Sequence, residues 1–240
     1  MKRIVVFLMA FVGALSAQGQ CFDENFTFRT GEKIRYHAYY NWGVIWLDAG
    51  WVEFEVKDKT FQGREVWHLD ALGQTHKDYD WLFKVRDRFQ SYLDKETLRP
   101  LWFERKTNED GYRVHNIYNY KPGDAGEVYT QSVNSEKDLE QDTFQLDGCT
   151  YDVMTSVYAA RNIRFEGTEV GEKIPLNMIV DNEVFNLYIR YLGKETIKLR
   201  SSKRRFRCHV FSPLLVEGTI FSGGEDMKVY VTDDLNRVPV

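Results

Sequence analysis

The sequence contains little cysteine and little proline, with three cysteines and five prolines among 240 residues. It lacks a Cys-x-x-Cys pair, so neither a thioredoxin-like site nor a cysteine-based metal site has support. It also lacks low-complexity segments, internal repeats and linker-like stretches. These absences favour one large domain over several small ones.

A hydrophobic run long enough to cross a bilayer is absent as well. The apolar run at residues 4–15 has about a dozen residues, whereas a membrane span needs about 20. Two basic residues precede the run, and Ala17 and Gly19 follow it. This pattern predicts a signal peptide over residues 1–19, and a periplasmic or secreted mature chain of a Gram-negative-type envelope. A retained N-terminal anchor is the alternative.

The position of Cys21, just after the apolar run, raises the further alternative of a lipoprotein. A lipid-attachment cysteine needs a small residue directly before it, and Gln20 stands there. We therefore expect cleavage before Gln20 and release of residues 20–240 as a single β-rich domain without a transmembrane segment.

An oxidising compartment permits a disulfide. We predict that Cys149 pairs with Cys208, which leaves Cys21 free near the N-terminus. Spacing alone does not fix the pairing, and three separate thiols are the alternative.

A strong excess of charge of one sign is also missing, because 32 Lys and Arg stand against 36 Asp and Glu. Without a basic surface, nucleic acid is not an expected partner. The composition indicates no oligomeric state.

Aromatic residues are abundant, at 15% of the chain, and favour pleated, half-buried surfaces. In residues 51–57, Val52, Phe54 and Val56 alternate with charged residues, as in a strand with one buried face. Asp181 and Asn182 predict a two-residue hairpin turn. The expected strands are residues 34–40, 51–57, 65–72, 84–94, 101–106, 113–120, 128–133, 174–180, 183–191, 195–200, 205–211, 218–221 and 227–232.

One helix is expected at residues 151–162, with Thr150 as its cap and Arg161 in its last turn. The predicted fold is mostly β: a large antiparallel curled sheet, or a partly closed β-barrel, with this helix packed against it. A two-sheet sandwich is the alternative. Asp87 and Asp152 are expected to be structural, with a buried Asp–Arg pair to Arg161 joining helix and sheet.

The sequence lacks the Gly-x-Ser-x-Gly, His-Glu-x-x-His, Walker and dinucleotide-binding motifs. Two histidines have an aspartate two positions later, which places both on one strand face: His68 with Asp70, and His76 with Asp78. Each pair suits either a metal or acid–base site or an ordinary surface hydrogen bond. We predict the ordinary bond, and expect no metal and no cofactor.

Tryptophans supply the candidate binding residues. Trp42 and Trp46 lie in residues 41–51, which hold three tryptophans and two glycines, and suit either a core hairpin or a surface that stacks on a sugar or lines an apolar cavity. Trp81 ends the densest polar–aromatic cluster, residues 76–81. The basic residues 201–207 suit either a solvated turn or a contact with anionic lipid.

Four segments together resemble the bacterial exported family called domain of unknown function 3108. They are Gly31-Glu32-x-Ile34-x-Tyr36, then Arg86-Asp87-x-Phe89-x-Ser91-x-x-Asp94 with Thr97-Leu98-x-Pro100, then Asp152-x-Met154-Thr155-Ser156-x-Tyr158-x-x-Arg161, and Val229-Tyr230-Val231-Thr232-x-Asp234-x-x-Arg237-x-Pro239-Val240. Tyr230 stands where the family often has tryptophan. The resemblance implies a secreted or periplasmic β-rich protein, no nameable enzyme activity, and a chain that continues past Val240.

The leading hypothesis is a non-catalytic periplasmic protein that binds an apolar or lipid-like ligand in the curled sheet or acts in envelope assembly. One alternative is an envelope glycan or peptidoglycan hydrolase that uses Asp78, Asp80 or Asp87, because glycoside hydrolysis needs paired carboxylates. Another is a protein-interaction module with an exposed apolar face.

Overall fold

A computed structural model describes residues 21–22, 24–42, 45–121, 126–146, 148–199, 203–217 and 222–240. For residues 41–42, 45–46, 217 and 222–223 it describes the backbone alone. The predicted signal peptide, residues 201–202 of the basic segment and the predicted strand at 218–221 lie outside the described residues.

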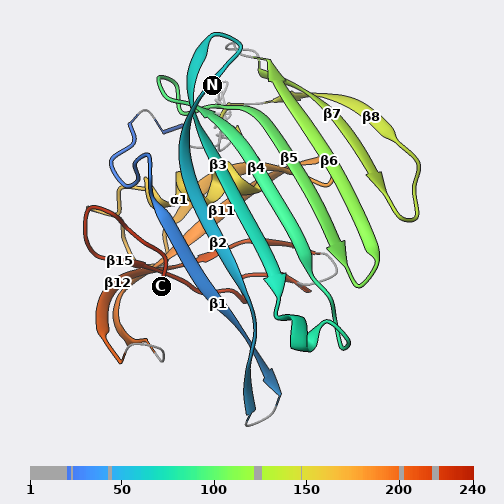
Figure 1. Cartoon of the computed structure of the whole chain (residues 1–240). Coiled ribbons are helices and arrows are strands. Elements are labelled where there is room, and N and C mark those ends of the chain that lie inside the picture. The colour runs from blue at the N-terminus through green and yellow to red at the C-terminus, as the bar shows by residue number, and fades with distance from the viewer. Residues whose placement is uncertain are drawn as a thin grey trace, which may run out of the picture.

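The first two thirds of the chain form an eight-stranded antiparallel sheet in which each strand pairs with the next along the sequence. Figure 1 shows this sheet curling around the inner elements. Its strands are β1 (Lys33–Trp42), β2 (Ile45–Phe61), β3 (Arg64–Thr75), β4 (Arg86–Asp94), β5 (Pro100–Glu109), β6 (Tyr112–Lys121), β7 (Gly126–Asn134) and β8 (Glu140–Leu146). Within the described strands β1 and β8 are edges, so the sheet is not closed.

The last third forms a five-stranded sheet in the order β15-β12-β11-β10-β9. Its strands are β9 (Thr150–Tyr151), β10 (Lys173–Val180), β11 (Glu183–Lys198), β12 (Arg205–Pro213) and β15 (Val229–Thr232). A short pair, β13 (Leu215–Glu217) and β14 (Ser222–Gly224), and the 3-10 turn η1 (Lys77–Tyr79) complete the described elements. The prediction of a mostly β fold with a large antiparallel sheet and one helix is confirmed. The second sheet corresponds to the two-sheet alternative.

The predicted turns and alternation explain the local structure. Asp181 and Asn182 join β10 to β11 with φ angles of 47° and 60°, the left-handed values of a tight hairpin. β11 is one continuous strand where two were expected, at 183–191 and 195–200. A bulge between Tyr191 and Gly193 shifts its pairing with β12 without ending the strand. Gly193 supplies the positive φ of 95° that this bulge needs.

The helix α1 (Val153–Arg161) lies between the two sheets, and Figure 1 shows it across the inner side of the larger one. Met154 and Tyr158 of α1 pack in one core cluster with Ile179 of the second sheet. The same cluster contains residues from the inner face of the larger sheet: Val56, Leu69, Ala71, Leu93, Phe103, Tyr118, Tyr120, Val128 and Leu146. The protein's own side chains therefore fill the curl of the sheet.

The helix begins later than predicted, and a different residue caps it. Tyr151 pairs with Met178 as part of β9, which excludes it from the helix. Asp152 accepts hydrogen bonds from the backbone N–H groups of Met154 and Thr155, while the Thr155 hydroxyl accepts from the Asp152 N–H. This reciprocal capping replaces the predicted role of Thr150. No helix in the described ranges has the length and apolar character of a membrane span.

Candidate functional site

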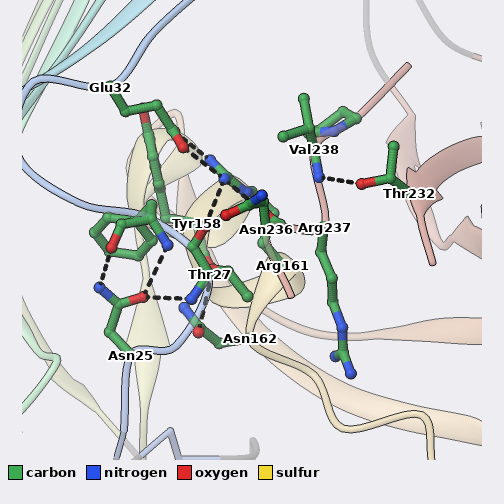
Figure 2. Close-up of polar contacts among 12 residues, drawn as sticks. Asn25, Thr27, Glu32, Tyr158, Arg161, Asn162, Thr232, Asn236, Arg237 and Val238 are labelled. Carbon is green, nitrogen blue, oxygen red and sulfur yellow. Dashed lines mark hydrogen bonds and ion pairs between the residues drawn. The ribbon is translucent and has the colours of Figure 1, made fainter. Parts of the chain in front are cut away.

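A buried arginine joins the segments before β1 and after β15 to the last turn of α1 (Figure 2). The Arg161 guanidinium donates to the Glu32 carboxylate at 2.6 and 2.9 Å, with Arg161 only 2% exposed. It also donates to the backbone carbonyls of Thr27 at 3.1 Å and Asn236 at 2.9 Å. We call Arg161 and these three partners the arginine hub. Its acceptors hold the guanidinium in place, which gives it a structural role.

The predicted buried pair between Arg161 and an aspartate is wrong. Asp152 begins α1 and Arg161 ends it, so about 13 Å of helix separates them. The Asp152 carboxylate instead accepts from the Ser91 hydroxyl at 2.7 Å, which ties the helix start to β4. Asp87 accepts from the backbone N–H of Asn108 at 3.2 Å. The partner that sequence reasoning missed is Glu32, which lies 129 positions from Arg161.

The predicted disulfide is wrong as well, because Cys149 bonds to Cys21, with 5.1 Å between their Cα atoms, and Cys208 is a buried free thiol. Cys208 lies on β12 and Cys149 directly precedes β9, with β11 and β10 between them in the sheet. Three strand spacings amount to about 14 Å, beyond the reach of a disulfide. A sulfur in a disulfide cannot also form the thioether of a lipid anchor, so this pairing disfavours the lipoprotein alternative.

The three aspartates proposed for hydrolysis have separate environments. Burial raises the pKa of Asp80, but hydrogen bonds from Arg86 at 2.6 Å and Thr75 at 2.9 Å outweigh it and leave the pKa below its usual value. Burial raises the pKa of Asp87 to about 6. Asp78 is exposed. Within the described chain, no hydrogen bond or ion pair joins these carboxylates to one another, and each has its own surroundings.

Trp81 belongs to an exposed apolar segment between η1 and β4. Trp81, Leu82 and Phe83 are 81%, 58% and 48% exposed, and we call these three residues the apolar loop. The side chains of Trp42 and Trp46 lie outside the described residues. Their backbones pair with Ile45 and Asn41 at the end of the β1–β2 hairpin.

The backbone of the apolar loop is held firmly although its side chains face solvent. Leu82 and Phe83 donate backbone hydrogen bonds to the Tyr79 carbonyl at 2.9 and 3.2 Å. Thr75 and Arg86, on either side of the loop, both bind the Asp80 carboxylate. The exposure of the three apolar side chains is therefore a feature of an ordered segment.

More aromatic and charged groups lie at this end of the sheet. Tyr39 and Tyr40 of β1 are exposed. Tyr39 pairs with Asp48, next to Ala49, whose carbonyl accepts from His76 at the start of η1. Lys77 and Lys84 are exposed on either side of the apolar loop. This end of the sheet therefore combines apolar and cationic side chains.

The predicted His–Asp pairs are replaced by contacts across strands. His68 bonds to Gln90 at 3.1 Å, and Asp70 binds Arg88 through two bonds of 3.0 Å. His76 contacts Asp48 at 3.1 Å, and His37 contacts the same carboxylate at 2.9 Å. His37, Asp48 and His76 form the one group in the described chain whose donor set fits a metal ion.

Most of the β-rich unit matches one protein family. A family model described as "Protein of unknown function (DUF3108)" matches residues 35–240. The chain belongs to the DUF3108 family. The matched part of this DUF3108 chain includes the histidine group, the apolar loop and Arg161, whereas Cys21 precedes it.

Neither the functionally curated proteins nor the solved structures supply a function for the chain. No functionally curated protein matches the chain. A solved structure described as the beta-barrel-like protein of domain of unknown function DUF1849 from Brucella abortus is similar, at 11% sequence identity over 79% of each chain, with a TM-score of 0.45.

Proposed function

We propose that this DUF3108 chain is a non-catalytic protein of the bacterial envelope, active in the periplasm after removal of residues 1–19. In this proposal it docks on a lipid surface through the apolar loop. The observation that carries the proposal is the run of three neighbouring apolar side chains, each about half exposed or more, on a backbone fixed by hydrogen bonds.

The chemistry of the apolar loop suits the boundary between headgroups and acyl chains. Removing a Leu or Phe side chain from water contributes about 1.5–3 kcal/mol, and Trp concentrates at membrane interfaces. Lys77 and Lys84 add attraction to anionic headgroups, worth about 1 kcal/mol for each cation near such a surface. The disulfide between Cys21 and Cys149 supports an oxidising compartment such as the periplasm.

The curl of the sheet is a poor place for the apolar ligand that the sequence suggests. The cavity beside α1, lined by Phe28, Leu93, Tyr158 and neighbouring residues, has a volume of about 10 Å³. That space holds about one water molecule. The end of the sheet, where side chains are exposed, is the better candidate.

Vesicle co-sedimentation tests the proposal. The chain of residues 20–240 is mixed with vesicles of phosphatidylethanolamine and phosphatidylglycerol, and with vesicles of phosphatidylcholine alone. We expect saturable binding to the anionic vesicles and a blue shift in tryptophan emission. The triple variant W81S/L82S/F83S is expected to bind at least 10-fold more weakly.

The matched control replaces three exposed apolar residues elsewhere on the surface. Leu139, Val170 and Leu235 are 57%, 72% and 79% exposed, compared with 58% for Leu82. Unlike the residues of the apolar loop, they lie in separate segments. The variant L139S/V170S/L235S should bind vesicles like the natural sequence. Equal loss in both variants, or binding that survives the loss of the apolar loop, contradicts the proposal. Capture of a protein partner without any vesicle binding favours the interaction-module alternative instead.

A further inference from the structure

The group of His37, Asp48 and His76 lies on two adjacent strands and at the end of a third, at one end of the larger sheet. His37 is on β1, Asp48 is on β2 and His76 directly follows β3. The Asp48 carboxylate lies between the two rings, with one oxygen 2.9 Å from His37 Nδ1 and the other 3.1 Å from His76 Nε2. Side chains from three separate segments thus bring their donor atoms within 4.8 Å of one another.

The backbone of the sheet sets this convergence. A bulge between Ala38 and Tyr39 shifts the pairing of β1, so that Tyr39 lies opposite Asp48. The Tyr39 ring stacks on the His37 ring, with 6.2 Å between their centroids. The His76 N–H donates to the Ala49 carbonyl at 3.0 Å, which extends the β2–β3 pairing by one residue and brings His76 beside Asp48.

Gly50 permits the close approach of β3 at this point. A Cβ atom at this position would lie 2.3 Å from the Gln74 carbonyl oxygen and 2.9 Å from the Thr75 Cα, which is too close for any other residue. Because Gly50 lacks that atom, β3 can pass near β2 just before His76. The glycine is therefore part of what places His76.

The charges around Asp48 differ from those around the other His–carboxylate contacts in the described chain. Lys106 contacts the same Glu104 carboxylate that His115 contacts. Lys194, Arg207 and His209 all surround Asp233. Asp48 forms ion pairs with His37 and His76 and, within the described residues, with no lysine or arginine. A divalent ion at Asp48 would therefore displace no ammonium or guanidinium group.

We propose that His37, Asp48 and His76 bind a divalent transition-metal ion, with zinc as the best fit. The three donor atoms lie within 4.8 Å of one another. Tetrahedral zinc with ligand bonds of 2.0–2.2 Å needs donor separations of about 3.3 Å, so small side-chain rotations suffice. Two imidazoles and one carboxylate favour zinc and similar ions over calcium or magnesium. The exposed position leaves a fourth place for water or for a donor from another molecule.

Calorimetry on the tag-free chain of residues 20–240, treated with EDTA and then titrated with zinc chloride, tests the site. We expect one zinc ion per chain, and at least 10-fold weaker binding in H37Q and in H76Q. H115Q is the matched control, because His115 makes a similar 3.0 Å contact with Glu104 but lacks a second histidine. It should bind zinc like the natural sequence.

Cobalt binding provides a second readout, because the visible spectrum of bound cobalt reports its coordination directly and does not depend on the stability of the fold. Visible absorption from tetrahedral cobalt should appear with the natural chain and with H115Q, and vanish in H76Q. Absence of saturable zinc binding, or equal weakening in H115Q, overturns the proposal. The W81S/L82S/F83S variant should keep full zinc affinity, so a failure of the lipid-docking proposal leaves this one standing and the reverse also holds.

Discussion

The arginine hub and the exposed end of the sheet both bring together side chains far apart in the sequence, yet they treat polar groups differently. In the hub, a buried guanidinium meets a carboxylate and two carbonyls. At the exposed end, two imidazoles share one carboxylate beside apolar side chains that face solvent. In the hub, protein acceptors bind both terminal nitrogens of the guanidinium, whereas the exposed end leaves groups available to another molecule. The first arrangement serves stability and the second suits binding.

The largest expected effect comes from breaking the hub. Replacing Arg161 with Met removes the guanidinium but keeps much of the side-chain volume. It leaves the Glu32 carboxylate and the Thr27 and Asn236 carbonyls without this donor. Losing one partner of a buried ion pair costs about 3–5 kcal/mol. We expect that decrease in the free energy of unfolding, measured by urea titration.

Arg164 is the matched control for the hub. It forms an ion pair with Glu24 in which both side chains are more than two-thirds exposed. Exposed pairs contribute about 0–1 kcal/mol, so R164M should leave the unfolding midpoint nearly unchanged. If R161M and R164M cost the same, the hub has no special role in stability.

The second effect concerns the disulfide that holds Phe22 and the N-terminal segment to the core. The variant C21A/C149A should lose roughly 2–4 kcal/mol of unfolding free energy, because it frees a loop of 128 positions in the unfolded chain. C208A provides the comparison, since Cys208 is buried but unbonded. Peptide mapping without reductant should recover Cys21 linked to Cys149, and a Cys149–Cys208 peptide would contradict the structure.

The smallest effect is a change in pH dependence at the start of α1. Burial raises the pKa of Asp152 to about 6, against the hydrogen bonds from Thr155, Ser91 and Met154. The folded state therefore holds this proton more tightly than the unfolded state, whose pKa is about 3.9. Its contribution to stability is full below pH 4 and is lost as pH rises through about 6.

D152N removes this titration, and asparagine caps helices about as well as aspartate. Between pH 4 and 7 the stability of D152N should improve relative to the natural chain by about 2 kcal/mol. Urea titrations at several pH values measure the difference. The exposed Asp78 gives the control variant D78N, which should run parallel to the natural chain. A parallel profile for D152N would mean that Asp152 titrates normally in the folded state.

Local patterns in the sequence predicted much of the fold. Alternation in β2 and the turn residues Asp181 and Asn182 act over a few neighbours, so they are visible without the structure. β8 was missed because it begins with four polar residues, Glu140 to Thr143, which leaves only Phe144 and Leu146 as apolar positions. The helix start was placed too early because β9 takes Tyr151 through a pairing with a distant strand.

The candidate sites depended on contacts that no local pattern encodes. The cysteine pairing follows from the strand order of the second sheet, which the sequence did not reveal. His76 was matched with Asp78, but its partner is Asp48 on the neighbouring strand β2, 28 positions away in the sequence. Trp81 was proposed as a binding residue because it ends a polar–aromatic cluster, whereas its exposure depends on how the chain turns after η1.

The convergence of distant segments on α1 has a kinetic consequence. Arg161 bonds to Asn236 across 75 positions and to Glu32 across 129, and the Tyr36 hydroxyl bonds to the Pro239 carbonyl across 203. Chains dominated by such non-local contacts fold slowly, because loop closure must precede the contacts that reward it. The helix therefore gains its last native partners only after residues 236–239 have been synthesised. Until then the Arg161 guanidinium lacks the hydrogen bond to Asn236, so the arginine hub is incomplete.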